Sequence, residues 1–255
     1  MLNRLELSLA WLCTLLLAPA TFASDGVIEI NQICATQTGC SQGDAPGFPV
    51  SLAGGSSYIL TSSLQVSGDV AALRGSGNSI GIDLNGFTIS GNYFCSSAPP
   101  NCLSRAVHAA IEAPGSAVSV RNGTIRAWHG PAIDVGFGSR VEDLLIERGG
   151  NDGILARSGS IIRGNSISNL FGTGIRVQYN DEVSGDALVE GNIIQSLRGD
   201  GIHIGGGVVT ENFTTNIFGS AGIFASDAGY GLNRFSSSPI GGTSMGNNVC
   251  GSAAC

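Results

Sequence analysis

Lysine is absent from this chain, and charged residues of either sign are scarce. All 12 basic residues are arginines, only 12% of the 255 residues are charged, and the formal net charge is −7. Proteins that bind nucleic acid present clustered lysines and arginines to the phosphate backbone. An acidic chain without a basic cluster is therefore not expected to bind nucleic acid.

Long apolar runs are also lacking, apart from one at the N-terminus. Residues 1–23 combine Arg4, a short apolar core at residues 7–18 and a small-residue cleavage site at residues 21–23, which together predict a secretory signal peptide. The apolar core is too short to span a bilayer. We expect an exported protein, periplasmic or extracellular, with no membrane span.

Histidines do not accompany the cysteines at the spacing of a zinc site. Cys13 lies within the predicted signal peptide, and six cysteines remain after its removal: Cys34, Cys40, Cys95, Cys102, Cys250 and Cys255. Export favours disulfide bonds. Among the pairings that six cysteines allow, closeness in sequence favours 34–40, 95–102 and 250–255.

Glycine is abundant, with 39 residues, and much of it belongs to a repeat between residues 118 and 225. The isoleucines at this repeat position, called here the Gly-Ile isoleucines because all but the first follow a glycine, are Ile133, Ile154, Ile175, Ile202 and Ile223, spaced by 21, 21, 27 and 21 residues. A fixed period of this size is typical of a solenoid. Apolar residues recur at every second position, which predicts three short β-strands per coil and disfavours a helix in each repeat.

The repeat divides the chain into four parts. Residues 24–56 carry no period and are expected to form an N-terminal cap, because the end of a solenoid exposes unpaired strand edges. Residues 57–226 form the predicted solenoid, with polar insertions at 91–104 and 178–187. The period is lost from residue 227, so residues 227–255 are predicted to form a C-terminal cap.

Three features carry a resemblance to a known family: the LNGFTISG stretch at residues 84–91, the Gly-Ile strands and a column of turn asparagines. The column comprises Asn85, Asn122, Asn165, Asn192 and Asn212. Residues 57–225 thereby resemble the right-handed parallel β-helix, or pectin-lyase-like, superfamily, and in particular its small exported bacterial members. The resemblance implies an all-β fold, a single-stranded right-handed parallel β-helix. It does not imply one function, because the same coil occurs in lyases, hydrolases and non-enzymatic proteins.

The resemblance also implies that the Gly-Ile strand is the first of each coil, whose outer face is commonly a substrate groove. The outward residues of this strand are Glu112, Asp134, Leu155, Arg176, His203 and Phe224. Neighbouring coils lie about 4.8 Å apart. Glu112 and Asp134 are then adjacent, Arg176 lies beside His203, and these four residues are the catalytic candidates. The alternative is that the column is merely a solvated polar face.

Adjacent carboxylates destabilise a sheet unless a cation, a proton or an arginine offsets their repulsion. Ca²⁺ suits such a pair, so Glu112 and Asp134 are also the metal candidates. Paired carboxylates also perform glycoside hydrolysis, whereas in lyases of this superfamily an arginine is the base. By that analogy Arg176 is the base, with His203 the more conventional alternative. The motifs of the polygalacturonase-type hydrolases (Asn-Thr-Asp, Asp-Asp, Gly-His-Gly, Arg-Ile-Lys) are missing, which favours a lyase over a hydrolase.

Loops beside this face supply the predicted substrate contacts Trp128, Tyr93 and Tyr179. Trp128 can stack on a sugar ring or pack as local core, and the sequence leaves both alternatives open. The acidic 178–187 insertion is a weaker candidate for Ca²⁺. Asp152 and Asp200 precede Gly-Ile steps, where a turn uses aspartate to bond backbone groups.

A further set of charged residues predicts fold support without a site. Arg121, Glu142, Arg163 and Glu190 occupy one repeat position with alternating sign, which predicts a surface ion-pair ladder. The sequence as a whole predicts an exported, monomeric, carbohydrate-associated β-helix with polysaccharide as its partner. The alternatives are a polysaccharide lyase or glycoside hydrolase acting on an acidic glycan, and a structural or adhesive surface scaffold.

Overall fold

The computed structural model describes residues 26–93, 95–96, 101–102, 107–178, 185–219, 221–236, 239–251 and 253–254. The predicted signal peptide and residues 179–184 of the second insertion lie outside this range. Within the described residues, no helix has the length and apolar character needed to cross a membrane.

One short strand from nearly every coil joins an eight-stranded parallel sheet, here called the first-strand sheet. Its strands are β2 (Val50–Ser51), β5 (Leu73–Arg74), β10 (Ile111–Ala113), β12 (Ile133–Val135), β14 (Ile154–Arg157), β17 (Ile175–Gln178), β20 (Ile202–Ile204) and β23 (Ile223–Ala225). The Gly-Ile isoleucines from Ile133 to Ile223 are direct partners on neighbouring strands. The predicted repeat is therefore confirmed, residue for residue.

The other two strands of each coil join an 18-stranded sheet that wraps around two sides of the stack. Second-strand positions are held by β1 (Ile28–Ile30), β3 (Ser57–Leu60), β6 (Gly81–Asp83), β15 (Ser160–Arg163), β18 (Asp186–Glu190), β21 (Gly206–Thr210), β24 (Gly229–Gly231) and β26 (Thr243–Gly246). Third-strand positions are held by β4 (Leu64–Gln65), β7 (Thr88–Ser90), β16 (Ser166–Leu170), β19 (Ile193–Leu197), β22 (Phe213–Ile217), β25 (Arg234–Phe235) and β27 (Val249–Cys250). β11 (Ser119–Arg126) and β13 (Arg140–Gly149) run through both positions, since β11 pairs with both β6 and β7.

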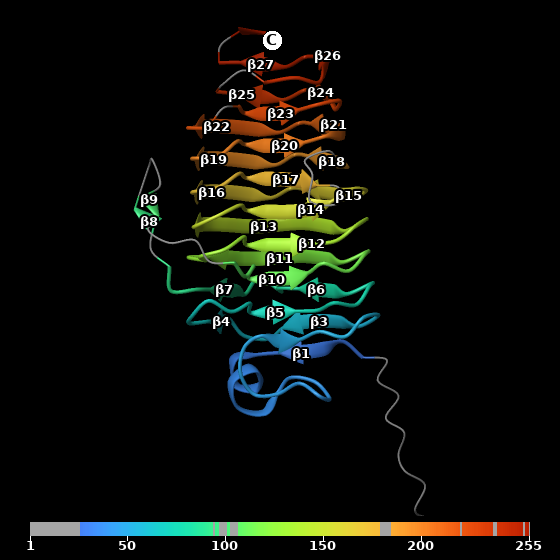
Figure 1. The fold of residues 1–255 in the computed structure, drawn as a ribbon, viewed down its shortest axis with the longest axis vertical. Helices are drawn as coiled ribbons and strands as arrows, with labels where there is room; N and C mark the ends of the chain where they lie inside the picture. Colours follow the sequence, from blue (N-terminus) through green and yellow to red (C-terminus); the bar gives the residue numbers. More distant parts are fainter. Residues whose placement is uncertain are drawn as a thin grey trace, which may run out of the picture.

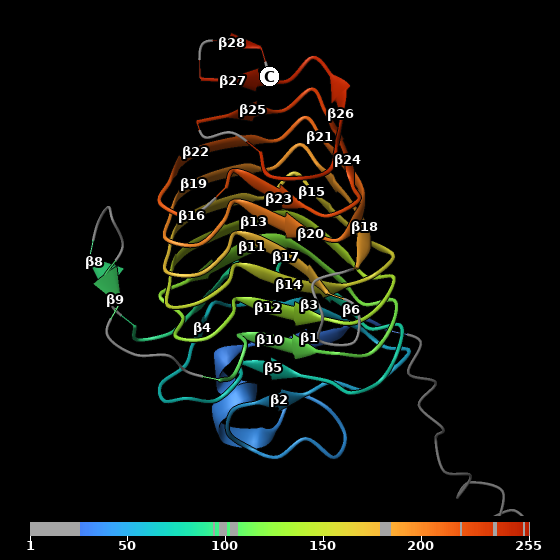
Figure 2. The ribbon, with the colours of Figure 1, turned by 45° about the horizontal axis from the view of Figure 1, so that its top comes forward.

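The coils stack along the long axis of the molecule from β1 to β27 (Figure 1). The turned view in Figure 2 shows each coil passing in turn through the first-strand sheet and the two sides of the larger sheet. A separate antiparallel hairpin, β8 (Cys95–Ser96) and β9 (Asn101–Cys102), projects from the side. The predicted fold class, an all-β single-stranded right-handed parallel β-helix, is confirmed.

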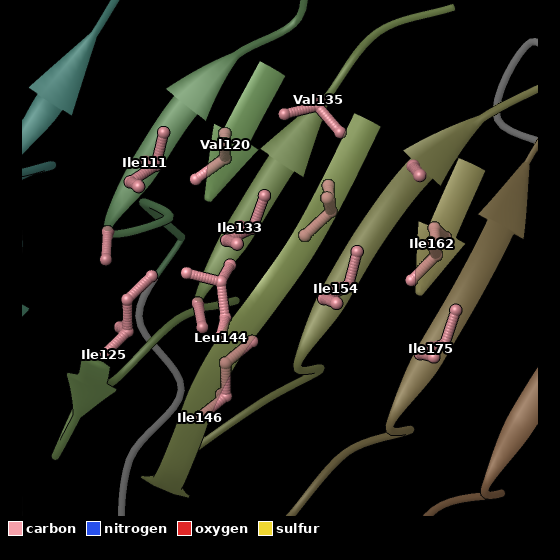
Figure 3. Close-up of a cluster of buried hydrophobic side chains, with 14 of the residues drawn as sticks. Ile111, Val120, Ile125, Ile133, Val135, Leu144, Ile146, Ile154, Ile162 and Ile175 are labelled. Atoms are coloured by element: carbon pink, nitrogen blue, oxygen red, sulfur yellow. The ribbon is translucent and has the colours of Figure 1, made fainter. Parts of the chain in front are cut away.

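Inward side chains of successive coils form one continuous apolar core. Figure 3 shows Ile111, Ile133, Ile154 and Ile175 in a row on neighbouring strands, and all four are fully buried. Burial of an isoleucine side chain stabilises the fold by about 2 kcal/mol. The alternation of inward and outward residues that builds this core also fixes which residues face solvent on the opposite side of each strand.

A ladder of buried asparagines joins the turns between second and third strands. It runs through Asn165, Asn192, Asn212, Asn233 and Asn248. Each side-chain amide donates to the Oδ1 of the next asparagine over 2.9 to 3.2 Å. The backbone N–H of each of the first four donates to the same oxygen. Buried turn amides are thereby satisfied without water.

Asn85 and Asn122 do not belong to this ladder, which corrects the predicted column. Both have a left-handed backbone, with φ of 50° and 59°, and their side-chain amides donate to Leu60 O and Asp83 Oδ1. The register places Asn122 level with Asp143 and Gly164, whose φ angles are 54° and 65°. Asparagine tolerates this conformation better than most residues. Asparagine is therefore selected at two neighbouring positions for different reasons. At Asn122 it tolerates the left-handed backbone, and at Asn165 it supplies the buried hydrogen bonds of the ladder.

The alternating charges on the second strands are partners in register, as predicted. Arg163 Nε lies 3.0 Å from a Glu142 oxygen, so this step of the ladder forms an ion pair. Arg121 instead bonds Asp83, 3.0 Å away in the preceding coil. The predicted Arg121–Glu142 step is therefore replaced by a different pairing, and such exposed pairs contribute little stability.

The N-terminal end is covered by the one-turn π-helix η2 (Cys34–Thr38), and a disulfide joins Cys34 to Cys40 as predicted. Cys95 and Cys102 are backbone partners in the β8–β9 hairpin, but their side chains lie outside the description. Cys250 is disulfide-bonded. Its predicted partner, Cys255, falls on a residue that is not described.

The C-terminal segment continues the stack beyond residue 226. β24 and β26 extend the second-strand side in parallel, and β25 and β27 extend the third-strand side. β28 (Ala253–Ala254) then folds back antiparallel on β27. The apolar spacing weakens after residue 227, whereas the asparagine ladder persists through Asn233 and Asn248 and marks these coils.

Candidate functional site

The outward residues of the first-strand sheet form one column across seven coils, which we call the first-strand face. The column is Arg74, Glu112, Asp134, Leu155, Arg176, His203 and Phe224. Each candidate residue faces outward because its neighbours on the strand point into the core, as Ile133 and Val135 do around Asp134. The predicted adjacency of Glu112 with Asp134, and of Arg176 with His203, is present in the register.

Glu112 is bound by an arginine from the preceding coil. Arg74 Nε donates to Glu112 Oε2 over 2.9 Å, and Arg74 Nη2 lies 2.8 Å from the same oxygen. Arg74 Nη2 also lies 2.9 Å from His108 Nδ1. A guanidinium only donates, so His108 Nδ1 is the acceptor in this contact. The longer 3.4 Å contact between His108 Nδ1 and Glu112 is then secondary.

Asp134 has a separate arginine partner. Arg157 Nη1 donates to Asp134 Oδ1 over 3.1 Å, and both side chains are more than three-quarters covered. The two adjacent carboxylates therefore hold one arginine each. Of the three ways to offset their repulsion, the structure uses arginine.

The predicted calcium site gains no further ligands from its surroundings. Among the described residues, no group of three or more His, Cys, Asp or Glu side chains could hold a metal ion. Ca²⁺ binding requires six to eight oxygen ligands, of which protein side chains supply several. Binding of Ca²⁺ by Glu112 and Asp134 stays a prediction.

Arg176 is held between an aspartate and a threonine. Its Nε donates to Asp152 Oδ2 over 2.7 Å, and its Nη2 donates to Thr173 Oγ1 over 3.0 Å. The other oxygen of Asp152 accepts the backbone N–H of Thr173 over 2.7 Å. Asp152 thus links two coils and fixes an outward side chain at the same time. The turn role predicted for it is present, but its bond reaches the next coil.

Asp200 repeats this arrangement around His203. Asp200 Oδ1 accepts the backbone N–H of Ala221 in the next coil over 2.9 Å, and Oδ2 lies 3.3 Å from His203 Nδ1. The His203 ring also packs on Phe224, with centroids 4.4 Å apart. A carboxylate at Nδ1 favours a proton there, which leaves Nε2 of the neutral ring as an acceptor.

The predicted substrate-contact aromatics are not presented to solvent. Trp128 is 4% exposed, belongs to the core and donates its indole N–H to the carbonyl oxygen of His108 over 2.9 Å. Of the two alternatives for Trp128, the structure therefore shows packing as local core, since a covered ring offers no face to a sugar. Tyr93 is 7% exposed and packs edge-on against His129. Tyr179 lies outside the described residues.

Other aromatic rings border the face at the corner that precedes each first strand. Phe171 lies in the coil of Arg176, and Arg198 of the next coil covers its ring at 5.4 Å. Phe218, one coil further, is half exposed. The corner beside the Asp200–His203 pair therefore offers exposed aromatic surface that the residue column alone does not reveal.

Comparison with known proteins bears on the fold. A family model described as a right handed beta helix region matches residues 71–248, which is more than half of the chain. The chain belongs to the right-handed β-helix family. No curated protein and no solved structure matches it. Membership of the β-helix family establishes the fold and does not determine the function.

Sequence reasoning missed the partners that hold this β-helix's outward side chains in place. Arg74, His108 and Arg157 were not candidates, although Arg74 and Arg157 bind the two predicted carboxylates. A signal was present for Arg74, since it lies level with Glu112 in the strand register. Arg157 lies beyond the Gly-Ile step of its strand and reaches Asp134 diagonally, so the column gives no sign of it.

Proposed function

We propose that this protein is an exported β-helix that binds carbohydrate on its first-strand face. The observation that carries the proposal is a row of outward polar side chains, fixed by partners on the same or neighbouring coils, that ends against the His203–Phe224 ring pair. Hydroxyl-rich ligands need fixed donors and acceptors beside an apolar surface. The first-strand face combines fixed polar groups with the apolar surface of the His203–Phe224 ring pair.

The geometry of the coils suits an extended polymer. Successive coils are about 4.8 Å apart, so a chain lying along the axis meets a new side chain at every coil. The partners hold these side chains in single orientations, which reduces the conformational entropy lost on binding. The Cys34–Cys40 disulfide supports the export part of the proposal, because such bonds persist in oxidising compartments.

The test is a binding screen of the purified mature protein against oligosaccharides of mixed composition, followed by calorimetry on the best ligand. Phe224→Ala and His203→Ala should each weaken binding about tenfold or more. Phe213→Ala is the matched control, because Phe213 is an exposed aromatic on the third-strand side and not on this face. Equal losses from Phe213→Ala and Phe224→Ala would place the ligand elsewhere and contradict the proposal.

A second candidate function is catalysis at His203, and the Asp200–His203 contact favours it. An imidazole oriented by a carboxylate can act as a general base in hydrolysis or in proton abstraction by a lyase. Arg176 suits the base role less well, because Asp152 and Thr173 engage two of its nitrogens. Glu112 also suits the role of general acid poorly, because its ion pair uses the ionised form.

Product analysis separates these functions. Neutral and acidic polysaccharides incubated with the mature protein, with and without Ca²⁺, should yield cleaved products if His203 is catalytic. Unsaturated ends would indicate a lyase and saturated ends a hydrolase. His203→Ala should then abolish release of product while leaving the fold intact by circular dichroism. Intact polymers throughout the panel would exclude catalysis and leave binding alone.

A further inference from the structure

The arginines of the first-strand face are already neutralised by the protein itself. Arg74 is bound to Glu112, Arg157 to Asp134 and Arg176 to Asp152, at nitrogen–oxygen distances of 2.7 to 3.1 Å. Asp200 adds a fourth carboxylate, which lies against His203. Three arginines against four carboxylates leave a net negative charge on the face when the histidines are neutral.

The neutralisation of Arg176 is built into the coils and does not depend on flexible surface contacts. Asp152 is also held by the Thr173 N–H, so its carboxylate cannot swing away from Arg176, and the Ala221 N–H holds the Asp200 carboxylate in the same way. Asp152 and Arg176 are mostly covered, with side chains 11% and 26% exposed. Arg198, at the adjoining corner, stands outside the column with its guanidinium over Phe171.

An acidic polysaccharide carries carboxylates that need unpaired cations when they leave water. Binding one here would require breaking an internal ion pair or placing like charges beside Asp134, Asp152 or Asp200, and both cost free energy. A neutral glycan instead requires hydrogen-bonding groups and apolar surface, which the His203–Phe224 end provides. We infer that the ligand of the first-strand face is an uncharged glycan, an inference that rests on the proposed function.

The first experiment compares neutral and acidic probes on the wild-type protein. Calorimetry would use oligosaccharides of cellulose, xylan and mannan against oligogalacturonate and alginate fragments, at about 0.1 M and about 1 M NaCl. The expected result is binding of a neutral probe with an affinity that salt does not change, and acidic binding about tenfold weaker or absent. Preferential acidic binding that Phe224→Ala abolishes would overturn the inference while supporting the proposed function. Binding of neither class would overturn both.

The second experiment tests the stated cause by releasing one arginine. In Asp152→Asn the amide oxygen can still accept the Thr173 N–H, while the charge opposite Arg176 is lost. This variant should gain salt-sensitive binding of acidic probes, about tenfold above wild type. Asp134→Asn, which releases Arg157, is the second variant should the first not fold.

The matched control is Asp83→Asn, which releases Arg121 on the second-strand side with the same change in net charge. It should leave acidic binding at the wild-type level. An equal gain in Asp83→Asn would assign the effect to overall charge. Either that result, or no gain in folded Asp152→Asn and Asp134→Asn, would overturn the account of internal neutralisation.

Discussion

Replacing Asn192 by alanine should lower the free energy of unfolding by about 4 kcal/mol. Asn192 is fully buried, and its Oδ1 accepts both the backbone and the side-chain N–H of Asn165. Its amide nitrogen donates to the carbonyls of Ile162 and Glu190 and to Asn212 Oδ1. Alanine leaves several of these buried groups unpaired, and each such group costs about 1–3 kcal/mol.

Urea denaturation of wild type and variant measures this effect. Asn78→Ala is the control, since Asn78 is exposed and its Oδ1 accepts the Ser116 N–H. The control should lose about 1 kcal/mol or less. Equal losses in the two variants would show that water or a rearranged turn satisfies the ladder groups, and the ladder would then not be a main source of stability.

Gly174→Ala should destabilise the protein by about 3 kcal/mol, although glycine has no side chain to lose. A Cβ at Gly174 would lie 2.6 Å from the Gly201 oxygen, 2.8 Å from Ile194 Cγ2 and 3.0 Å from Leu197 Cδ1. The Gly201 oxygen accepts the N–H of Ile175, so the added methyl would also disturb the bond that joins two coils. Glycine at position 174 is thus required by the close approach of one coil to the next.

The melting temperature of Gly174→Ala checks this expectation. Gly26→Ala is the matched substitution, because a Cβ at Gly26 meets nothing within 4 Å. Gly26→Ala should melt with the wild type, whereas Gly174→Ala should melt several degrees lower. A Gly174→Ala protein that melts with the wild type would mean that the coils separate without cost, and this explanation of the Gly-Ile step would be wrong.

The register of the first-strand sheet could be predicted from sequence because strand periodicity is rigid. Once the Gly-Ile isoleucines are aligned, the outward position next to each is fixed, and Glu112 and Asp134 must be neighbours. Side-chain partners could not be predicted in the same way. Arg157 reaches Asp134 from the neighbouring coil by a diagonal path, which depends on rotamers that the repeat does not encode.

The turn asparagines show a second limit of sequence reasoning. Asn122 and Asn165 look equivalent in the sequence because each adjoins a glycine in a turn. Asn122 precedes its glycine and has a positive φ, whereas Asn165 follows its glycine and is buried in the ladder. Composition alone does not separate a residue chosen for backbone conformation from one chosen for hydrogen bonding.

The asparagine ladder gives the stack a direction. The backbone N–H of Asn165 is satisfied by Asn192, that of Asn192 by Asn212, and that of Asn212 by Asn233. In each case the acceptor lies in the coil that is synthesised later. Because a ribosome delivers the N-terminal coils first, each new turn keeps a backbone donor without its asparagine acceptor until the following coil arrives. Completion of the turns therefore follows synthesis from the N-terminus toward the C-terminus, one asparagine at a time.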